Sequence, residues 1–293
     1  MSAHRWSGDS TVSVHAESTA ALLASTAGVI ASASDTPQLD AEVLLAFVTG
    51  RARSSLLAFP ERPLTAVEAQ RLAGLAARRA AGEPVAYLTG AREFFSLALA
   101  VTPAVLIPRA ETELLVEEAL ARCAGLPRPA VLDVGTGSGA IALAVKHERS
   151  AATVTGLDVS ESALAVARAN AAGLKLDVRW LRSSWFEALA DERFDVIVSN
   201  PPYVASADVV GPLAFEPRLA LDGGGDGYAA YREILSAAPA HLAPDGALLL
   251  EHGHAQRATL AALAKAGGWR VAGVRDDLAA RERVMVLTRS TAP

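Results

Sequence analysis

Strand-like and helix-like segments alternate from about residue 129 to the end of the chain, and this alternation restricts the fold more than any other feature. Apolar runs that we predict to be strands lie at residues 131–134, 153–157, 176–181, 194–199 and 247–251, near residue 271, and at 284–287. Helical spacing of apolar residues separates most of them. Such a chain folds as a parallel sheet with crossover helices, and such sheets bind ligands at the carboxyl ends of their strands.

A glycine loop follows the first predicted strand, with the sequence Gly135-Thr136-Gly137-Ser138-Gly139. Glycines let the backbone turn tightly into a helix and approach a ligand closely. Asp158 ends the next strand, where its carboxylate can accept both hydroxyls of a ribose. Ala140 stands where dinucleotide loops carry a third glycine, and Asp133 suits the ammonium of a methionine group better than a pyrophosphate. Both details favour S-adenosylmethionine over NAD and FAD.

A second motif, Asn200-Pro201-Pro202-Tyr203, follows the predicted strand at 194–199. The prolines remove two backbone donors and keep the chain extended, so that carbonyl oxygens can point into a pocket. An amide, free carbonyls and a flat ring suit a planar substrate that bears an NH2 group. Together with the nucleoside-binding loop, the motif resembles that of amino methyltransferases, whose substrates include base amines and side-chain amides.

The N-terminal third shows helical spacing and short loops from about residue 17 to 81. Thr65 and Glu68 match a capping box, and Gly50 and Gly82 are natural helix stops. We interpret this part as a small helical bundle that serves recognition, followed by a connector with a short hairpin near residues 93–101. Three arginines of the last helix predict a solvated face, with a patch for a macromolecule as the alternative: Arg71, Arg78 and Arg79.

Composition excludes several classes of protein. The net charge of −5 argues against a protein that binds nucleic acid by neutralising phosphates. Cys123 is the single cysteine, which rules out an internal disulfide and fits a reducing compartment. The first 18 residues lack an apolar core and are interpreted as a disordered tail, and we expect a cytoplasmic protein. No metal-ligand spacing occurs, and His252 and His254 are interpreted as structural residues.

Seven stretches, in this order, resemble the protein-(glutamine-N5) methyltransferase family, also called PrmC or HemK: GEPVAYLTG, LIPRAETELL, VLDVGTGSGAIALA, SSWF, VSNPPY, FEPRLAL and LLLEHG. The resemblance begins near residue 20 and includes the helical domain. It implies an α/β, Rossmann-like class I S-adenosylmethionine-dependent methyltransferase, with a seven-stranded sheet whose last strand is antiparallel. We expect a helical recognition domain at 19–84, a connector and hairpin at 85–108 and a methyltransferase domain at 109–293.

The resemblance also implies a role for each motif. The glycine loop Gly135–Gly139 and Asp158 would hold S-adenosylmethionine, and Trp185, which core packing would explain equally well, would lie against the adenine. Asn200 would contact both the cofactor and the substrate. The substrate would be the glutamine of the Gly-Gly-Gln loop in class 1 peptide chain release factors, bound by the side chain of Asn200 together with Pro201, Pro202 and Tyr203. We expect a monomer without metal, membrane or direct nucleic-acid binding.

Three positions depart from the family pattern. Ser184 replaces a common acid before the tryptophan, Ala110 replaces a proline, and Ala280 replaces a glycine. The first puts a hydrogen bond to the adenine amine in question. Three other functions stay open at this point: methylation of a glutamine in a ribosomal protein, methylation of adenine N6 in DNA, and a non-enzymatic sensor of S-adenosylmethionine or a nucleotide.

Overall fold

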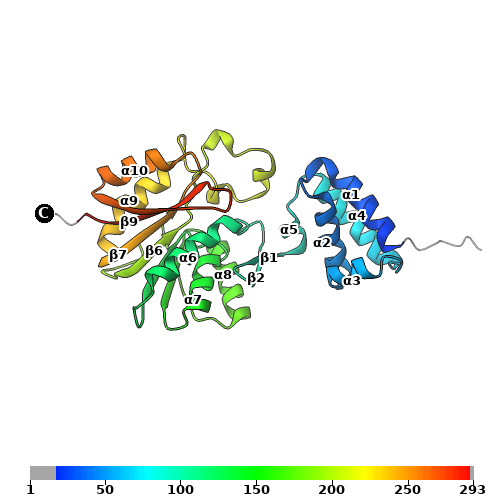
Figure 1. Ribbon diagram of the computed structural model, residues 1–293, viewed down its shortest axis with the longest axis horizontal. Coiled ribbons are helices and arrows are strands. Elements are labelled where there is room, and N and C mark those ends of the chain that lie inside the picture. The colour runs from blue at the N-terminus through cyan, green and yellow to red at the C-terminus, as the bar shows by residue number, and fades with distance from the viewer. Residues whose placement is uncertain (1–17, 291–293) are drawn as a thin grey trace, which may run out of the picture. The chain divides into compact units, whose positions relative to one another are not determined.

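The computed structural model describes residues 18–290. The chain forms two compact units that divide between Thr89 and Gly90 (Figure 1). Apart from Ser18, which caps the first helix, the predicted tail lies outside the described residues. None of the helices between residues 18 and 290 has the length and apolar character that crossing a membrane requires.

The N-terminal unit is a helical bundle, as the apolar spacing predicts. Its core is made of leucines that are almost fully buried, among them Leu44, Leu45 and Leu72. The Thr65 hydroxyl accepts the Glu68 N–H while the Glu68 carboxylate accepts the Thr65 N–H, so the predicted capping box is present. The helices are α1 (Thr19–Ile30), η1 (Ala31–Ala33), α2 (Pro37–Thr49), α3 (Arg53–Ala58), α4 (Ala66–Ala80) and α5 (Val85–Thr89).

The second unit begins with a hairpin, close to the predicted position. Strands β1 (Ala91–Phe94) and β2 (Leu97–Ala100) pair antiparallel. Phe95 and Ser96 turn the chain with φ values of 49° and 62°, as a two-residue hairpin turn requires. The hairpin is fastened to the rest of the unit because the Phe95 N–H donates to the Glu113 carboxylate, 2.9 Å away.

A seven-stranded sheet forms the middle of this unit. The strand order is β5-β4-β3-β6-β7-β9-β8. All neighbouring strands from β5 to β7 run parallel, whereas β9 is antiparallel to both of its neighbours. This confirms the predicted topology. The strands are β3 (Ala130–Val134), β4 (Thr153–Asp158), β5 (Arg179–Arg182), β6 (Phe194–Ser199), β7 (Leu242–Glu251), β8 (Trp269–Asp276) and β9 (Glu282–Arg289).

Both faces of the sheet are buried, so its strands read as continuous apolar runs. Val196 and Val198 belong to the core on one face, whereas Ile197 between them belongs to the core on the other. Helices α6, α7 and α8 lie on the first side and α9 and α10 on the second (Figure 1). Their bounds are α6 (Glu113–Arg122), α7 (Ala140–Glu148), α8 (Glu161–Leu174), α9 (Ala229–His241) and α10 (Arg257–Ala266).

Two strands and one long loop differ from the prediction. Strand β5 begins at Arg179 instead of residue 176, and β7 begins at Leu242 instead of residue 247. The chain between β6 and α9 had no predicted structure. It contains three short 3₁₀ helices, η3 (Ser206–Asp208), η4 (Gly211–Phe215) and η5 (Arg218–Ala220), whose turns are set by local backbone hydrogen bonds.

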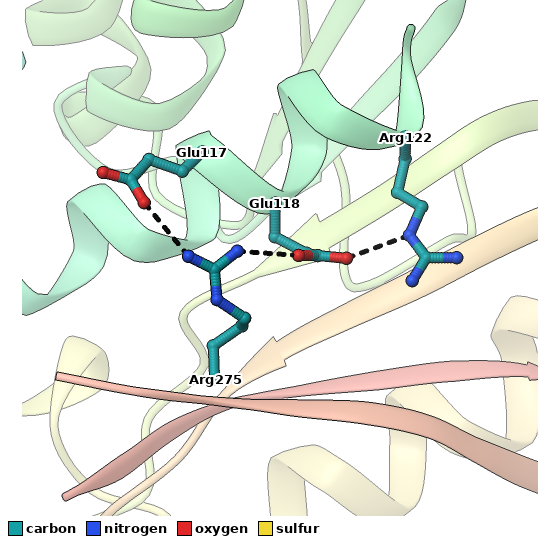
Figure 2. Close-up of polar contacts among 4 residues, drawn as sticks. All are labelled: Glu117, Glu118, Arg122 and Arg275. Carbon is teal, nitrogen blue, oxygen red and sulfur yellow. Dashed lines mark hydrogen bonds and ion pairs between the residues drawn. The ribbon is translucent and has the colours of Figure 1, made fainter. Parts of the chain in front are cut away.

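An ion-pair network ties α6 to strand β8 (Figure 2). The Glu118 carboxylate accepts from Arg122 at 2.9 Å and from Arg275 at 3.0 Å, and Arg275 also contacts Glu117 at 3.3 Å. The Glu118 side chain is 10% exposed, against 52% for Glu117. Because exposed ion pairs add little to the free energy of unfolding, we expect the buried Glu118 to stabilise this contact more than Glu117 does.

Glu118→Ala should therefore lower the free energy of unfolding by about 1–3 kcal/mol, since it leaves two arginines without a buried partner. Glu117→Ala on the same helix should change it by less than about 0.5 kcal/mol. Urea unfolding followed by tryptophan fluorescence measures both. Equal losses in the two variants would show that Glu118 has no special role.

Candidate active site

The glycine loop Gly135–Gly139 connects β3 to α7 as predicted. The φ angles of Gly135, Gly137 and Gly139 are 75°, 56° and 82°, a region that side chains rarely adopt. A Cβ at Gly139 would lie 2.9 Å from the Trp180 ring, so that glycine serves packing. A Cβ at Gly135 or Gly137 would meet no atom within 4 Å, and both glycines line a large cavity.

Asp133 does not lie where the sequence suggested. It is fully buried below the loop instead of lining the cavity. Its Oδ2 accepts from the Thr136 hydroxyl at 2.6 Å and from the Ala142 N–H at 3.2 Å. Burial raises the pKa of Asp133 to about 7. The carboxyl thus shapes the loop, and the expectation that it faces an ammonium group is not supported by its position.

Asp158 lies at the end of β4, beside the loop, and lines the same cavity. Its two oxygens accept the N–H groups of Gly137 and Ser160, each at 2.9 Å. Burial raises the pKa of Asp158 above its ordinary value, although these hydrogen bonds oppose the effect. The carboxylate joins the glycine loop to the next crossover and faces the cavity at the same time.

Trp185 and Ser184 line the same cavity. The φ angle of Trp185 is 47°, a left-handed conformation that costs a bulky residue roughly 1–2 kcal/mol. Backbone strain of this kind is found at functional sites. Two other loop residues named from the sequence, Thr136 and Ser138, are buried and do not line the cavity.

The large cavity has a volume of about 440 Å³, which falls in the range of small-molecule sites, about 300–1,000 Å³. Glycines without side chains form one wall, and a carboxylate and an indole ring form others. This set fits a nucleoside cofactor. Among residues 18–290, no three His, Cys, Asp or Glu side chains come together in a way that could hold a metal ion.

Asn200 lies at the carboxyl end of β6. Its Nδ2 donates to the Thr112 hydroxyl at 3.2 Å, and Thr112 is buried at the end of η2 (Ala110–Thr112). Because Thr112 engages Nδ2 of the amide, Oδ1 is the acceptor that Asn200 has left for a ligand. The structure thereby gives Asn200 a defined direction that the sequence could not.

A second cavity of about 110 Å³ shares part of its lining with the large one, including Asn200 and Pro201. Tyr203 and Arg109 line only this smaller cavity, whereas Pro202 lines only the large one. Four residues line both cavities: Leu106, Asn200, Pro201 and Ala220. The predicted motif therefore stands between two chambers, one lined by the glycine loop and one by an aromatic ring.

Two residues that the sequence analysis missed form hydrogen bonds with Tyr203. Its hydroxyl lies 3.3 Å from Oε1 of Glu251, a carboxyl at the end of β7 that is 1% exposed. Its backbone carbonyl accepts the Gln256 side-chain amide at 3.0 Å. Burial and the nearby Glu251 raise the pKa of Tyr203 above its ordinary value, so the phenol stays protonated at neutral pH.

Arg109 pairs with a residue that is distant in the sequence. It pairs with Glu216, which is buried and also accepts the Ile107 N–H at 3.0 Å. The pair fastens the segment before η2 to the long loop between β6 and α9, beside the smaller cavity. Glu216 lies in the stretch FEPRLAL, which the sequence analysis used to identify the family without assigning a role to Glu216.

His252 and His254 lie outside both cavities. His252 is fully buried, its Nδ1 lies 3.0 Å from the Gly253 carbonyl, and burial lowers its pKa. His254 is exposed on the turn that follows β7. Neither ring is placed to exchange a proton with a ligand in these cavities.

Both parts of the chain match families of known proteins. Residues 21–90 match the PrmC N-terminal domain, and residues 110–266 match the methyltransferase small domain. The chain is 50% identical over 269 residues to a release factor glutamine methyltransferase of Burkholderia pseudomallei, covering 88% of this chain and 94% of that protein. The corresponding protein of Salmonella typhimurium is 48% identical, with 86% and 92% covered.

One solved structure adds to these relatives. It is the protein-(glutamine-N5) methyltransferase (release factor-specific) of Alicyclobacillus acidocaldarius, which is 30% identical. The similarity covers 66% of this chain and 100% of that one, with a TM-score of 0.41.

The buried Glu251 should make stability depend on pH. Its pKa is raised to about 7 by burial, so between about pH 4.5 and 7 the folded state holds a proton that the unfolded state has lost. The free energy of unfolding should then fall as pH rises, by up to about 1.4 kcal/mol per pH unit.

Glu251→Gln should reduce this slope without abolishing it, because burial also raises the pKa of Asp133 to about 7, and the exposed Glu187→Gln should leave the slope unchanged. Urea unfolding at several pH values between 5 and 8 measures the slopes. Parallel pH profiles for wild type and Glu251→Gln would contradict the assignment of a raised pKa to Glu251.

Proposed function

We propose a function on the premise that this chain belongs to the release factor glutamine methyltransferase family. Members of this family are S-adenosylmethionine-dependent enzymes, and this chain is one of them. The specific proposal is that it methylates the side-chain nitrogen N5 of the glutamine in the Gly-Gly-Gln motif of class 1 peptide chain release factors.

One observation carries the proposal. Asn200 and Pro201 are the motif residues that line both cavities, so a group bound in the smaller cavity can meet a group bound in the larger one beside them. A methyltransferase needs this arrangement because its donor and acceptor must meet at one point and nowhere else. Positioning of this kind is worth about 7–11 kcal/mol of the barrier in favourable cases.

On the donor side, the large cavity would hold S-adenosylmethionine, which supplies a methyl group activated by a positively charged sulfur. Gly135 and Gly137 leave the wall open for close approach, and Asp158 offers carboxylate oxygens to a ribose. Trp185 offers an apolar surface to the adenine. The Ser184 hydroxyl also lines this cavity and can take the place of the acid that is common there.

On the acceptor side, the chain must make a poor nucleophile react. The lone pair of a carboxamide nitrogen is delocalised into its carbonyl, so geometry matters more than acid–base chemistry. We assign Oδ1 of Asn200 and the Pro201 carbonyl to the two amide hydrogens of the substrate glutamine. Acceptors at both hydrogens would turn the nitrogen toward the donor cavity. As the new N–C bond forms, the bond between the methyl group and the donor sulfur would break, and one amide proton would pass by way of these oxygens to solvent.

Tyr203 and the prolines complete the acceptor side. The ring of Tyr203 would cover the flat face of the glutamine amide and exclude water, which strengthens the electrostatic effects inside the site. Its hydroxyl and backbone carbonyl are both engaged, so the ring has a fixed direction. Pro201 and Pro202 have no N–H groups that would compete for the acceptor oxygens.

The helical unit is the candidate for choosing the partner. A clamp for an NH2 group does not by itself distinguish a protein glutamine from a nucleobase, whereas a dedicated helical domain can bind a protein surface. The relatives that share this domain are named after release factors. We therefore propose class 1 release factors as partners, a monomeric enzyme and a cytoplasmic location, where translation ends.

Asp158→Ala should weaken S-adenosylmethionine binding about tenfold to a hundredfold, the loss expected for a hydrogen bond to a charged group. Glu161→Ala, which removes a neighbouring exposed carboxylate, should leave the affinity unchanged. Isothermal titration calorimetry measures both. Wild-type affinity in Asp158→Ala would remove Asp158 from the cofactor site.

Asn200→Ala should slow methyl transfer to a purified class 1 release factor by about a hundredfold or more, since removal of one positioned group at a reacting centre has effects of this size. Mass spectrometry locates and counts the methyl groups, and circular dichroism checks the fold.

Ribosomal proteins incubated in parallel provide the competing acceptor. Methylation of the Gly-Gly-Gln glutamine supports the proposal. A wild-type enzyme that methylates a ribosomal protein and not the release factor would refute the acceptor, whereas an active Asn200→Ala variant would refute the mechanism.

A further inference from the structure

A buried carboxyl, Glu251, lies behind the residues 200–203 that would bind the acceptor, and the function proposed above uses only its contact with the Tyr203 hydroxyl. Glu251 ends β7, is 1% exposed and lines neither cavity. Its Oε1 accepts from the Tyr203 hydroxyl at 3.3 Å, and its Oε2 has no hydrogen-bond partner among the described residues. A buried carboxyl oxygen without a hydrogen-bond partner lowers the stability of the fold, so Oε2 of Glu251 needs an explanation.

The Thr112 hydroxyl is the neighbour that can use this oxygen. Thr112 lies beside Glu251, close enough to lower the pKa of the carboxyl. It is itself 4% exposed, and its oxygen already accepts from Nδ2 of Asn200 at 3.2 Å. A hydroxyl has one proton to donate, and inside the protein that proton needs an acceptor.

The direction of the Asn200 amide depends on where this proton goes. A hydroxyl that donates elsewhere can only accept from Asn200, and it therefore selects the Nδ2 end of the amide. A hydroxyl free to donate to Asn200 would also accommodate the flipped amide, with Oδ1 toward Thr112 and NH2 toward the cavities. A flipped Asn200 would offer a donor where the substrate amide requires an acceptor.

We propose that Glu251 is a positioning residue: by accepting the Thr112 proton, it fixes the Asn200 amide with its oxygen toward the acceptor. This proposal deepens the function proposed above and rests on it for its catalytic consequence. In this proposal a chain of hydrogen bonds runs from Glu251 through Thr112 to Asn200, and Glu251 itself never touches the substrate.

The charges around Glu251 suit this role at slightly alkaline pH. Arg283 on β9 favours the ionised form, Glu111 on η2 opposes it, and the phenols of Tyr203 and Tyr231 lie beside it. The Tyr231 hydroxyl donates to the Glu251 backbone carbonyl at 2.9 Å and holds the strand end in place. At pH 8 the ionised carboxylate can only accept a hydrogen bond, so the Thr112 hydroxyl would donate to it.

The test compares Glu251→Gln and Thr112→Val with Thr112→Ser, which keeps the hydroxyl. The first readout is the NMR signal of the Asn200 side-chain NH2 at pH 8 in the free enzyme, identified by its loss in Asn200→Ala. The second is kcat and KM for release factor methylation. S-adenosylmethionine affinity, measured by calorimetry, controls for damage to the donor cavity.

We expect the Asn200 signal to shift in Glu251→Gln and Thr112→Val and to stay in place in Thr112→Ser. In the same two variants kcat should fall about tenfold or more, as when outer partners of ligand-binding residues are removed. S-adenosylmethionine affinity should stay within about twofold. If Glu251→Gln is unstable, Thr112→Val still tests the proposal, because it removes the same proposed hydrogen bond from its other end.

An unshifted Asn200 signal in both variants would overturn the proposal, and so would a wild-type kcat. The NMR readout needs no acceptor, so it decides the orientation even if the wild-type enzyme methylates no release factor. A wild-type enzyme that methylates no release factor would refute the proposed function, and the NMR result would still decide the orientation of Asn200.

Discussion

The parallel pairing of β3 with its two neighbours is the interaction on which the site depends. Val134 of β3 pairs with Leu157 of β4, and Asp133 pairs with Val198 of β6. In this register the three strands end together, so the glycine loop, Asp158 and Asn200 meet at one edge of the sheet. The Ser199 hydroxyl donates to the Val134 carbonyl at 2.7 Å and secures the join between β3 and β6.

The elements around this edge limit the freedom of the clamp. The backbone at residues 201–203 cannot pair in a ladder, because Pro201 and Pro202 have no N–H groups. Instead, side chains from distant parts of the chain hold the motif. Thr112 before α6 contacts the Asn200 side chain, Glu251 at the end of β7 contacts the Tyr203 hydroxyl, and Gln256 before α10 contacts the Tyr203 carbonyl. Helix α6 is also anchored near its middle by Glu118, so Thr112 has a firm base.

Local patterns predicted much of this fold because their causes are local. The capping box at Thr65 and the strand at 194–199 follow from side chains within a few residues. The glycine loop and the proline motif were found for the same reason. Whether their residues play the roles assigned to them remains a prediction.

The missed groups depend on contacts that join distant parts of the chain. Arg109 and Glu216 are 107 residues apart, and Thr112 and Asn200 are 88 apart. Periodicity carries no information about such pairs. Asp133 shows the same limit, because its place before the loop suggested a ligand contact while its burial gave it a structural task. Chemistry at a strand end is readable from sequence, but the direction of a side chain there is not.

A crystal structure with S-adenosylhomocysteine and a Gly-Gly-Gln peptide would test the central claim most directly. The claim is that Asn200 and Pro201 separate donor from acceptor and present two oxygens to the substrate amide. The glutamine nitrogen should lie in the smaller cavity, within about 3.2 Å of both Oδ1 of Asn200 and the Pro201 carbonyl. A glutamine bound elsewhere, or one whose nitrogen contacts neither oxygen, would contradict it.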